Sequence, residues 1–228
     1  MSSMSTAGRG RPARLDRAST VATALELLDE VGLEALTMRR LADRLGVQAG
    51  ALYRHFTTKQ DLLTAMAERM LRPLAEPLPE PDGAADGAAD GAADWAARLT
   101  ALAHTMRRAL LARRDGARVF GGTHTTGPHT LAFAETALGA LREAGFRDED
   151  AARAFLTLVN YVLGHTLEEQ AALSDAPEDT GAVGRLRDAT TPGAHPHLTA
   201  ALPALTSPDF DTHFAFGLHV LVGGLRHL

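Results

Sequence analysis

Apolar residues recur at spacings of three and four along most of the chain, and this is the period of an amphipathic helix. The first such segment carries Val21, Leu25 and Leu28 on one face, with Asp16 as a candidate N-cap and Gly32 as a candidate stop. The pattern predicts an all-α protein. Further helices are predicted over residues 38–45, 48–56, 59–75, 94–110, 115–120, 129–144, 148–173 and 209–227, with a loop over 174–207 that holds one short helix near 183–189.

A tight turn between two short helices is predicted within residues 37–59. Thr37 is a candidate N-cap for the first helix, and Leu41 and Leu45 share one of its faces. Gly46 follows the last helical residue, as a glycine commonly does at the end of a helix. Val47 is then the apolar side chain that fills the turn.

The helix predicted after this turn has one buried face and one outward face. Leu52 and Phe56 are four residues apart and point inward, so Tyr53, Arg54 and His55 point largely away from the core. This is the helix-turn-helix pattern, in which the second helix enters the major groove of DNA. The alternative interpretation is an ordinary helical hairpin that contacts no nucleic acid.

The segment predicted over residues 148–173 is apolar on more than one face. Phe155, Leu158, Val162 and Leu167 cannot all lie on a single narrow stripe. A helix that is apolar on two sides is buried on both. One side can therefore line a pocket in the core, and the other can meet a partner.

Two segments interrupt the helical pattern. Residues 1–14 carry Arg9, Arg11 and Arg14 and form a predicted basic arm, which either reaches a minor groove or remains a solvated tail. Residues 77–93 contain Asp-Gly-Ala-Ala three times and predict a flexible linker. The predicted organisation is an arm at 1–14, a DNA-binding domain at 15–60, a connecting helix at 61–76, a linker at 77–93 and a helical body at 94–228.

Charge separates the two ends of this 228-residue chain. Residues 1–72 contain 11 Arg and Lys against 8 Asp and Glu, and the remainder contains 12 against 20, which together give the net charge of −5. A basic end on an acidic body suits a contact with phosphates. The chain has no cysteine, no apolar run long enough to span a membrane and no signal peptide, so we expect a cytoplasmic protein.

No catalytic, cofactor or metal site is predicted. The chain has ten histidines, but His195 and His197 lack the four-residue helical spacing of a zinc pair. The glycine-rich segment 121–128 lacks the Gly-Lys-Ser/Thr ending of a phosphate loop and suits a loop at the mouth of a pocket. No nucleophile stands at a useful spacing from a base, so an enzyme is not predicted.

The turn, the upstream helix, the Leu-Tyr-Arg-His-Phe run at 52–56 and Lys59 together resemble the N-terminal domain of the TetR family of transcriptional repressors. The body resembles the tetracycline-repressor branch of that family in the runs at 114–119, 145–146, 163–164, 167–170 and 214–218. The resemblance implies an all-helical homodimer with an N-terminal three-helix DNA-binding domain and a C-terminal ligand-binding and dimerisation domain. In this family the helices corresponding to 148–173 and 209–227 form the dimer core.

The resemblance assigns roles to residues near the turn. Arg39 matches an arginine that reads a guanine edge, where a guanidinium fork fits O6 and N7. The small residues Ala49, Gly50 and Ala51 suggest a close approach of the helix to DNA and a contact with a thymine methyl. Phosphate contacts are implied for Thr37, Tyr53 and Lys59, and base or backbone contacts for Gln48, Ala49, Gly50, Ala51, Arg54 and His55.

On the ligand side the chain departs from the tetracycline-repressor pattern. Those repressors hold magnesium-bound drug with two histidines and an asparagine, and Ala75, Leu102 and Phe120 stand at the matching positions. We therefore expect a largely apolar effector other than tetracycline–magnesium. The predicted ligand-binding residues are Leu102, Met106, Phe120, Thr123, Phe133, Phe155, Val159, His165 and Glu168, and the predicted dimer contacts are Leu158, Val162, Leu218, Leu221, Val222 and Leu225.

The leading hypothesis is a repressor that binds a palindromic operator as a homodimer and is released by a small effector. A second hypothesis is a helical protein that binds, sequesters or converts a small molecule and keeps a vestigial helix-turn-helix. A third is a family member that activates transcription. The sequence identifies neither the effector nor the operator.

Overall fold

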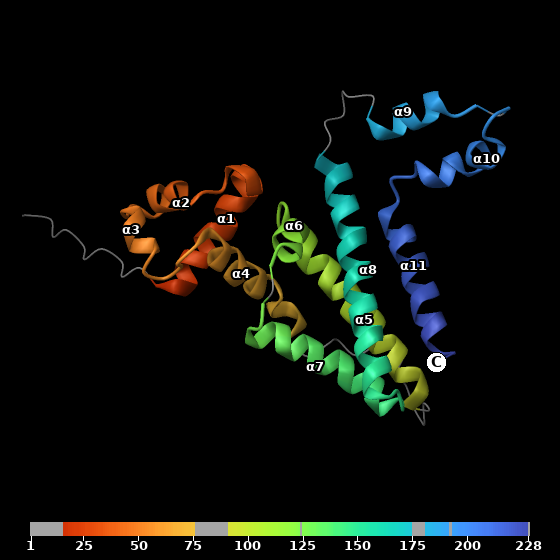
Figure 1. Cartoon of the computed structure of the whole chain (residues 1–228), viewed down its shortest axis with the longest axis horizontal. Helices are drawn as coiled ribbons and strands as arrows, with labels where there is room; N and C mark the ends of the chain where they lie inside the picture. The colour runs from red at the N-terminus through yellow and green to blue at the C-terminus, as the bar shows by residue number, and fades with distance from the viewer. Residues whose placement is uncertain (1–15, 76–90, 124, 175–180, 192, 228) are drawn as a thin grey trace, which may run out of the picture.

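The computed structural model describes residues 16–75, 91–123, 125–174, 181–191 and 193–227. Every regular element among these residues is a helix, which confirms the all-α prediction. Helices α1 to α4 form an N-terminal head, and α5 to α11 form the body beside it (Figure 1). The helices are α1 (Arg17–Ala35), α2 (Met38–Leu45), α3 (Ala49–Leu52), α4 (Lys59–Met70), the 3₁₀ turn η1 (Arg72–Leu74), α5 (Gly91–Leu111), α6 (Gly116–Gly121), α7 (Pro128–Glu143), α8 (Asp148–Ser174), α9 (Ala182–Ala189), α10 (Pro196–Leu205) and α11 (Phe210–Leu225).

The ends of α1 and α2 are set by the residues that the sequence indicates. Asp16 caps α1 by accepting a hydrogen bond from the Ser19 amide, and helical geometry is interrupted at Gly32, where φ is 77°. Thr37 caps α2 by accepting from the backbone amide of Arg40. Gly46 has φ of 65°, a left-handed conformation that a glycine adopts without strain, and it turns the chain toward α3.

Helix α3 is shorter than predicted. The sequence pattern predicts a helix over 48–56, whereas α3 covers four residues and then continues as a turn. The amide of His55 bonds the carbonyl of Leu52, three residues back, so the chain tightens before Phe56. Leu52 and Phe56 are nevertheless both buried, as predicted from their spacing. The prediction of which residues face inward is therefore confirmed, and the predicted length of regular helix is wrong.

Helix α4 joins the head to the body. Thr58 and Asp61 form a reciprocal capping box at its start, and the predicted helix over 59–75 ends at Met70 and passes into η1. Pro73 lies in that turn, where its missing amide and fixed φ tighten the chain. Helix α4 packs on α1 and α6, and η1 packs on α5 and α7. Helices α6 and α7 are thus in direct contact with the helix and turn that join the head to the body. A small displacement of either would act on the head.

The core of the body lies between α5, α7 and α8, with α11 against the far side of α8 (Figure 1). Leu99, Leu102 and Met106 of α5 are fully buried there, as is Val162 of α8. Helix α5 begins at Gly91, so residues 91–93, which the sequence assigns to the linker, are helical. The rest of the predicted linker and the basic arm lie outside the described residues.

Helices α9 and α10 extend from the body as a separate arm (Figure 1). The sequence correctly predicts α9 but assigns the residues of α10 to a loop, because they contain two prolines. Pro196 occupies the first turn of α10, where proline is well tolerated, and Pro203 lies near its end. No residue of α10 is buried. No helix in the described part of the chain is long and apolar enough to cross a membrane.

Candidate DNA-binding face, ligand pocket and interdomain contacts

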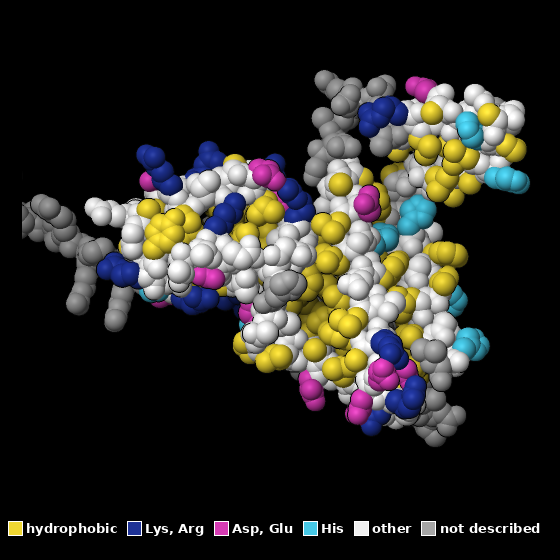
Figure 2. Space-filling view, in the orientation of Figure 1, with side chains coloured by type: hydrophobic (Ala, Val, Ile, Leu, Met, Phe, Trp, Pro, Cys, Tyr) yellow, Lys and Arg dark blue, Asp and Glu magenta, His cyan; other side chains and the backbone are white. Residues whose placement is uncertain are grey.

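The outer surface of α2 and α3 presents most of the predicted DNA-binding side chains to solvent. Arg39 and Arg54 are exposed, and Tyr53 is 52% exposed although it is a large aromatic residue. Figure 2 shows lysine and arginine side chains spread over this head. Thr37, Gln48 and Gly50 are also exposed, whereas Ala49, Ala51, His55 and Lys59 are half-buried.

Three cationic side chains near the helix-turn-helix donate hydrogen bonds to backbone carbonyls of the head. The Lys59 ammonium donates to the carbonyl of Leu33 at 3.3 Å, which ties the start of α4 to the end of α1. Arg17 donates to the carbonyl of His55 at 2.7 Å, and its guanidinium lies 4.5 Å from the centre of the Phe56 ring. Arg40 bonds the carbonyl of Ala35. Arg17 thus connects α1 to the turn after α3, and Lys59 and Arg40 fix the end of α1 to α4 and α2.

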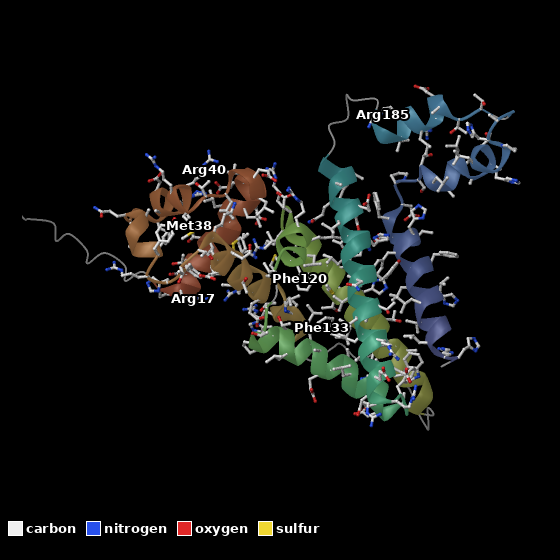
Figure 3. The ribbon with its side chains drawn as sticks, viewed as in Figure 1. Arg17, Met38, Arg40, Phe120, Phe133 and Arg185 are labelled. Atoms are coloured by element: carbon white, nitrogen blue, oxygen red, sulfur yellow. The ribbon has the colours of Figure 1, made fainter. Side chains whose placement is uncertain are left out.

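Aromatic and aliphatic side chains from four helices gather inside the body. Phe133 of α7 and Phe155 of α8 meet edge to face, with ring centres 5.4 Å apart. Leu102, Met106 and Phe133 are buried, while Phe120, Phe155 and Val159 are half-buried. Figure 3 labels Phe120 and Phe133 on α6 and α7, and Figure 2 shows hydrophobic side chains gathered between α6, α7 and α8. The side chains of this group are all apolar or aromatic.

The polar residues predicted to orient a ligand do not join this apolar group. The hydroxyl of Thr123 is occupied by a hydrogen bond to the Phe120 carbonyl. Glu168 is exposed on the outer side of α8. His165 faces α11, with its ring 5.1 Å from that of Phe214. Along α8, residues 155 and 159 face α7 and α6, so positions 165 and 168 lie on other sides of the same helix.

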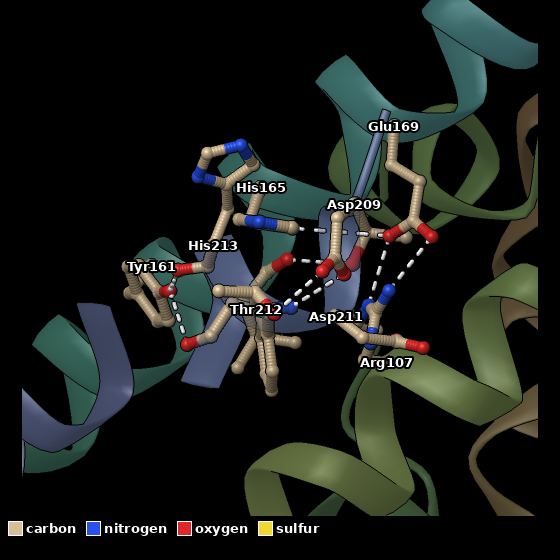
Figure 4. Close-up of polar contacts among 11 residues, drawn as sticks. Arg107, Tyr161, His165, Glu169, Asp209, Asp211, Thr212 and His213 are labelled. Atoms are coloured by element: carbon tan, nitrogen blue, oxygen red, sulfur yellow. Dashed lines mark hydrogen bonds and ion pairs between the residues drawn. The ribbon is translucent and has the colours of Figure 1, made fainter. Parts of the chain in front are cut away.

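A buried ion pair connects α5 to α8. The Arg107 guanidinium donates to both carboxylate oxygens of Glu169, at 2.8 and 2.7 Å, and a third bond at 2.6 Å reaches Asp211 of α11 (Figure 4). The side chains of Arg107 and Glu169 are only 9% and 8% exposed. Three helices are thereby fixed to one cation. Sequence reasoning missed this group, although an arginine within the apolar run Leu102 to Leu110 was a signal for it.

His165 lies beside this ion pair. Burial lowers the pKa of its imidazole, and the positive charge of Arg107 lowers it further. Its buried Nδ1 has no hydrogen-bond partner within the described residues and is 3.8 Å from Glu169. The charge of Glu169 is thus balanced by Arg107, not by the histidine.

The head contacts the body through a dense polar junction between α1 and the start of α6. Asp29 accepts from the side chain of Arg113 and the backbone amide of Arg114. Asp115 accepts from the amide of Leu33 at 2.8 Å, and it holds a left-handed conformation with φ of 57°. Asp tolerates this conformation at a small cost, so the junction keeps a specific geometry. It links α6, which carries Phe120, to the end of α1.

Glu68 forms a second link between head and body. Its carboxylate accepts from the amide of His129 at 2.6 Å and from the hydroxyls of Thr125 and Thr130 at 2.9 and 2.6 Å. A Cβ at Gly127 would lie 2.3 Å from the Glu68 Cδ atom, so a larger residue there would have to displace the Glu68 carboxylate. Burial raises the pKa of Glu68, but the hydrogen bonds together outweigh burial and hold it below its usual value.

We expect Glu68→Gln to lower the free energy of unfolding by about 1–3 kcal/mol at pH 7, since an amide cannot accept all these bonds. Because the folded-state pKa is depressed, the carboxylate stabilises the protein above the ordinary value near 4.5 and loses this effect as the pH falls below it. Urea unfolding between pH 7 and pH 3.5 measures both effects. The difference in unfolding free energy between the unsubstituted protein and Glu68→Gln should become smaller as the pH falls. A difference that stays constant would refute the stabilising role of the Glu68 carboxylate.

Family models match both parts of the chain. The model described as "Bacterial regulatory proteins, tetR family" matches residues 21–66, and the one described as "Tetracyclin repressor-like, C-terminal domain" matches residues 88–228. The chain belongs to the TetR family. It is 42% identical over 212 residues to the tetracycline repressor protein class A from transposon 1721 of Escherichia coli, covering 93% of this chain and 91% of that one.

Solved structures agree with this membership. A possible TetR family transcriptional regulator from Streptomyces coelicolor is 56% identical, with a TM-score of 0.81 over 93% of this chain and 99% of that one. The TetR family protein ActR of the same species, in complex with actinorhodin, is 30% identical with a TM-score of 0.78 over 94% and 98%. This TetR-family protein therefore has a helix-turn-helix head for DNA and a C-terminal domain of the tetracycline-repressor kind.

The side chains predicted to contact a partner subunit are mostly buried within the single chain, and their role in a dimer stays a prediction. Leu158 and Val162 of α8 and Leu218 of α11 are 1%, 0% and 2% exposed, because they already pack inside their own chain. Val222 and Leu225 are also buried, and Leu221 is half-buried. Leu158 and Val162 therefore lie on the buried side of α8. The large apolar side chains that α8 and α11 expose are Leu156, Leu173, Phe216 and Val220.

Proposed function

We propose that this TetR-family protein is a ligand-responsive repressor, which binds palindromic operator DNA as a homodimer and is released by a small, largely apolar effector. The observation that carries the proposal is the pairing of two features in one chain. One is an exposed helix-turn-helix face with Arg39 and Arg54 outward, and the other is an aromatic group formed by Phe120, Phe133 and Phe155. The α6 junction and Glu68 connect the two.

On the operator, the outward face of α2 and α3 divides into two kinds of contact. Arg39 would read a guanine edge, since its guanidinium is exposed on α2. Phosphate contacts that position the head would come from Thr37, Tyr53, Arg54, His55 and Lys59. The Lys59 ammonium also donates to the Leu33 carbonyl, so it would have to divide its donors between that carbonyl and the phosphate. Gln48, Ala49, Gly50 and Ala51 would lie against base edges, where small side chains allow close approach.

Dimerisation is supported by apolar surface that the single chain leaves uncovered. Phe216 is 72% exposed and Val220 is 55% exposed, and they are four residues apart on α11. The arm of α9 and α10 adds Val183 and Leu205, at 43% and 57%. Apolar surface of this extent typically marks an interface. A second copy would cover it and would place two heads about 34–36 Å apart, as two successive major grooves require.

We expect Phe216→Asp to weaken self-association at least about tenfold, because the carboxylate would be desolvated in the interface without a partner. Leu131→Asp is the matched control, since Leu131 is 58% exposed and lies on α7, a different helix from Phe216. Sedimentation velocity measures the change. Equal effects of the two substitutions would show that Phe216 lies outside the interface.

The proposed effector follows from the chemistry of the pocket. Leu102 and Phe120 provide no metal ligand and no hydrogen-bonding side chain at positions where tetracycline repressors carry such groups. The remaining lining from Met106, Phe133 and Val159 is also apolar. Other family members bind varied ligands, since ActR has been crystallised with actinorhodin. Polar contacts from Thr123, His165 and Glu168 remain predictions that would need these side chains to turn or a partner subunit to contribute.

Release is proposed to pass through α6. A ligand that presses on Phe120 would displace the same short helix whose N-cap, Asp115, accepts from the amide of Leu33. Arg113, in the turn before that N-cap, donates to Asp29 of α1. The amide side chain of Gln60 on α4 also bonds the carbonyl of Gly122 at 2.6 Å. A shift of α6 would therefore act on the end of α1 and on the start of α4. By linkage, effector and operator must weaken each other's binding by the same factor.

A mobility-shift titration tests the proposal. The complex of the protein with its own upstream DNA is titrated with tetracycline and magnesium, and separately with uncharged aromatic compounds and actinorhodin. We expect release by an apolar compound at concentrations where tetracycline–magnesium has no effect. Val159→Trp, which fills the pocket, should keep operator affinity and lose the response, whereas Leu131→Trp on the surface should change neither. Release by tetracycline–magnesium at the lowest concentration would overturn the assignment of the effector.

A further inference from the structure

A cleft of about 470 Å³ separates the head from the body on the side of α1 and α4. Its head wall is formed by α1 and α4, with Ala18, Val21 and Ala65 as an apolar floor. Its body wall is the segment from Thr125 to His129 that precedes α7. The volume is in the range of small-molecule sites. The cleft shares no lining residue with the aromatic group inside the body.

Glu68 holds the body wall of the cleft in place, and its carboxylate oxygens are already engaged in hydrogen bonds there. It accepts three short hydrogen bonds from Thr125, His129 and Thr130, and the His129 ring lies 3.0 Å from one of its oxygens. The oxygens of Glu68 are therefore already engaged by donors of the wall. Its single negative charge remains, but Arg17 and Arg69 in the same lining outnumber it.

Two guanidinium groups also line the cleft. Arg17 is positioned by its bond to the His55 carbonyl and by the Phe56 ring, and Arg69 is exposed on the last turn of α4. Neither arginine forms an ion pair with a carboxylate in the described part of the chain. An apolar floor beside two cations favours a ligand with a flat hydrophobic body and one acidic group, because a guanidinium binds a carboxylate in a bidentate manner.

We propose that this cleft is a binding site for small amphipathic anions, such as an aromatic carboxylate, separate from the pocket inside the body. The acidic group bonds Arg69 and Arg17, and the hydrophobic part lies on Ala18, Val21 and Ala65. Such a ligand touches α1, α4 and the loop before α7 together. It therefore stabilises the arrangement of head and body in which these walls face each other.

Methyl NMR of the full-length protein tests the site with 2-naphthoate as the probe and its uncharged analogue 2-naphthamide as the control ligand. We expect saturable shifts of the Ala18, Val21 and Ala65 methyl groups with 2-naphthoate, and binding of 2-naphthamide about tenfold weaker, since one charge-assisted contact is lost. Shifts confined to Leu102 and Val159, or no shifts at all, would overturn the proposal.

Substitutions separate this site from general attraction to a basic head. Arg69→Gln should weaken 2-naphthoate about tenfold, while Arg54→Gln, which removes the same charge from another surface of the head, should leave affinity within about twofold. Ala65→Leu places a larger side chain on the apolar floor and should abolish the ligand-induced shifts of the Ala18 methyl group. The rest of the spectrum should remain that of a folded protein. Equal affinity in the Arg69 and Arg54 variants would overturn the proposal. These outcomes do not depend on operator binding.

Discussion

Replacing Arg107 with alanine is expected to lower the free energy of unfolding by about 3–5 kcal/mol, because it leaves the buried Glu169 carboxylate without its cation. Arg107 also joins α5 to Asp211 of α11, so the loss affects the contact between three helices. Glu169→Gln should be less severe, since the amide oxygen still accepts from Arg107. Urea unfolding at pH 7 gives these differences directly.

A double variant tests whether the cost comes from the stranded charge. Arg107→Met with Glu169→Met removes both partners and should recover much of the stability lost in Arg107→Ala. Asp211→Asn is a further control, because the Asp211 side chain is 87% exposed and its ion pair is screened by solvent. We expect a change below about 1 kcal/mol there. Equal destabilisation by Arg107→Ala and the double variant would contradict the explanation.

Replacing Arg39 with alanine is expected to cost about 1–3 kcal/mol of operator binding for each base that it reads, which is about 5–150-fold. The second expected result is relaxed specificity, so that the variant no longer distinguishes the contacted guanine from other bases. Fluorescence anisotropy at fixed salt measures both quantities on the operator and on singly substituted duplexes.

Two controls separate base reading from general charge. Arg108→Ala removes an exposed cation from α5 of the body and should leave operator affinity nearly unchanged. Arg54→Ala should weaken operator and random duplexes by similar factors, if Arg54 contacts phosphates. An Arg39 variant that loses affinity equally for every duplex would assign Arg39 to the phosphate backbone instead.

Much of the head could be predicted because its signals are local. A cap at Thr37, a glycine at position 46 and the spacing of Leu52 and Phe56 each depend on a few neighbouring residues, and all are found in the structure. The regular part of α3 was overestimated because the inward positions Leu52 and Phe56 have helical spacing even when the turn between them tightens. Periodicity indicates which residues face inward and does not set where helical geometry ends.

The long-range features of the body could not be read from periodicity. Leu158 and Val162 were assigned to the partner because α8 is apolar on two sides, and the pattern alone does not say which side meets α5. His165 and Phe155 are both inward-facing, yet they contact different neighbouring helices. The bond between Arg107 and Glu169 joins residues 62 apart in sequence, so the apolar surroundings of Arg107 could indicate a buried cation but not its partner.

The central claim is that two copies of this chain present the α2–α3 surface to specific DNA. Its most direct measurement is an anisotropy titration of the chain's upstream DNA against a scrambled duplex at about 0.15 M salt, with stoichiometry from sedimentation of the complex. The account predicts two chains on each operator and a preference of at least about a thousandfold for the operator. Equal affinity for both duplexes, or a monomer bound to DNA, would contradict it.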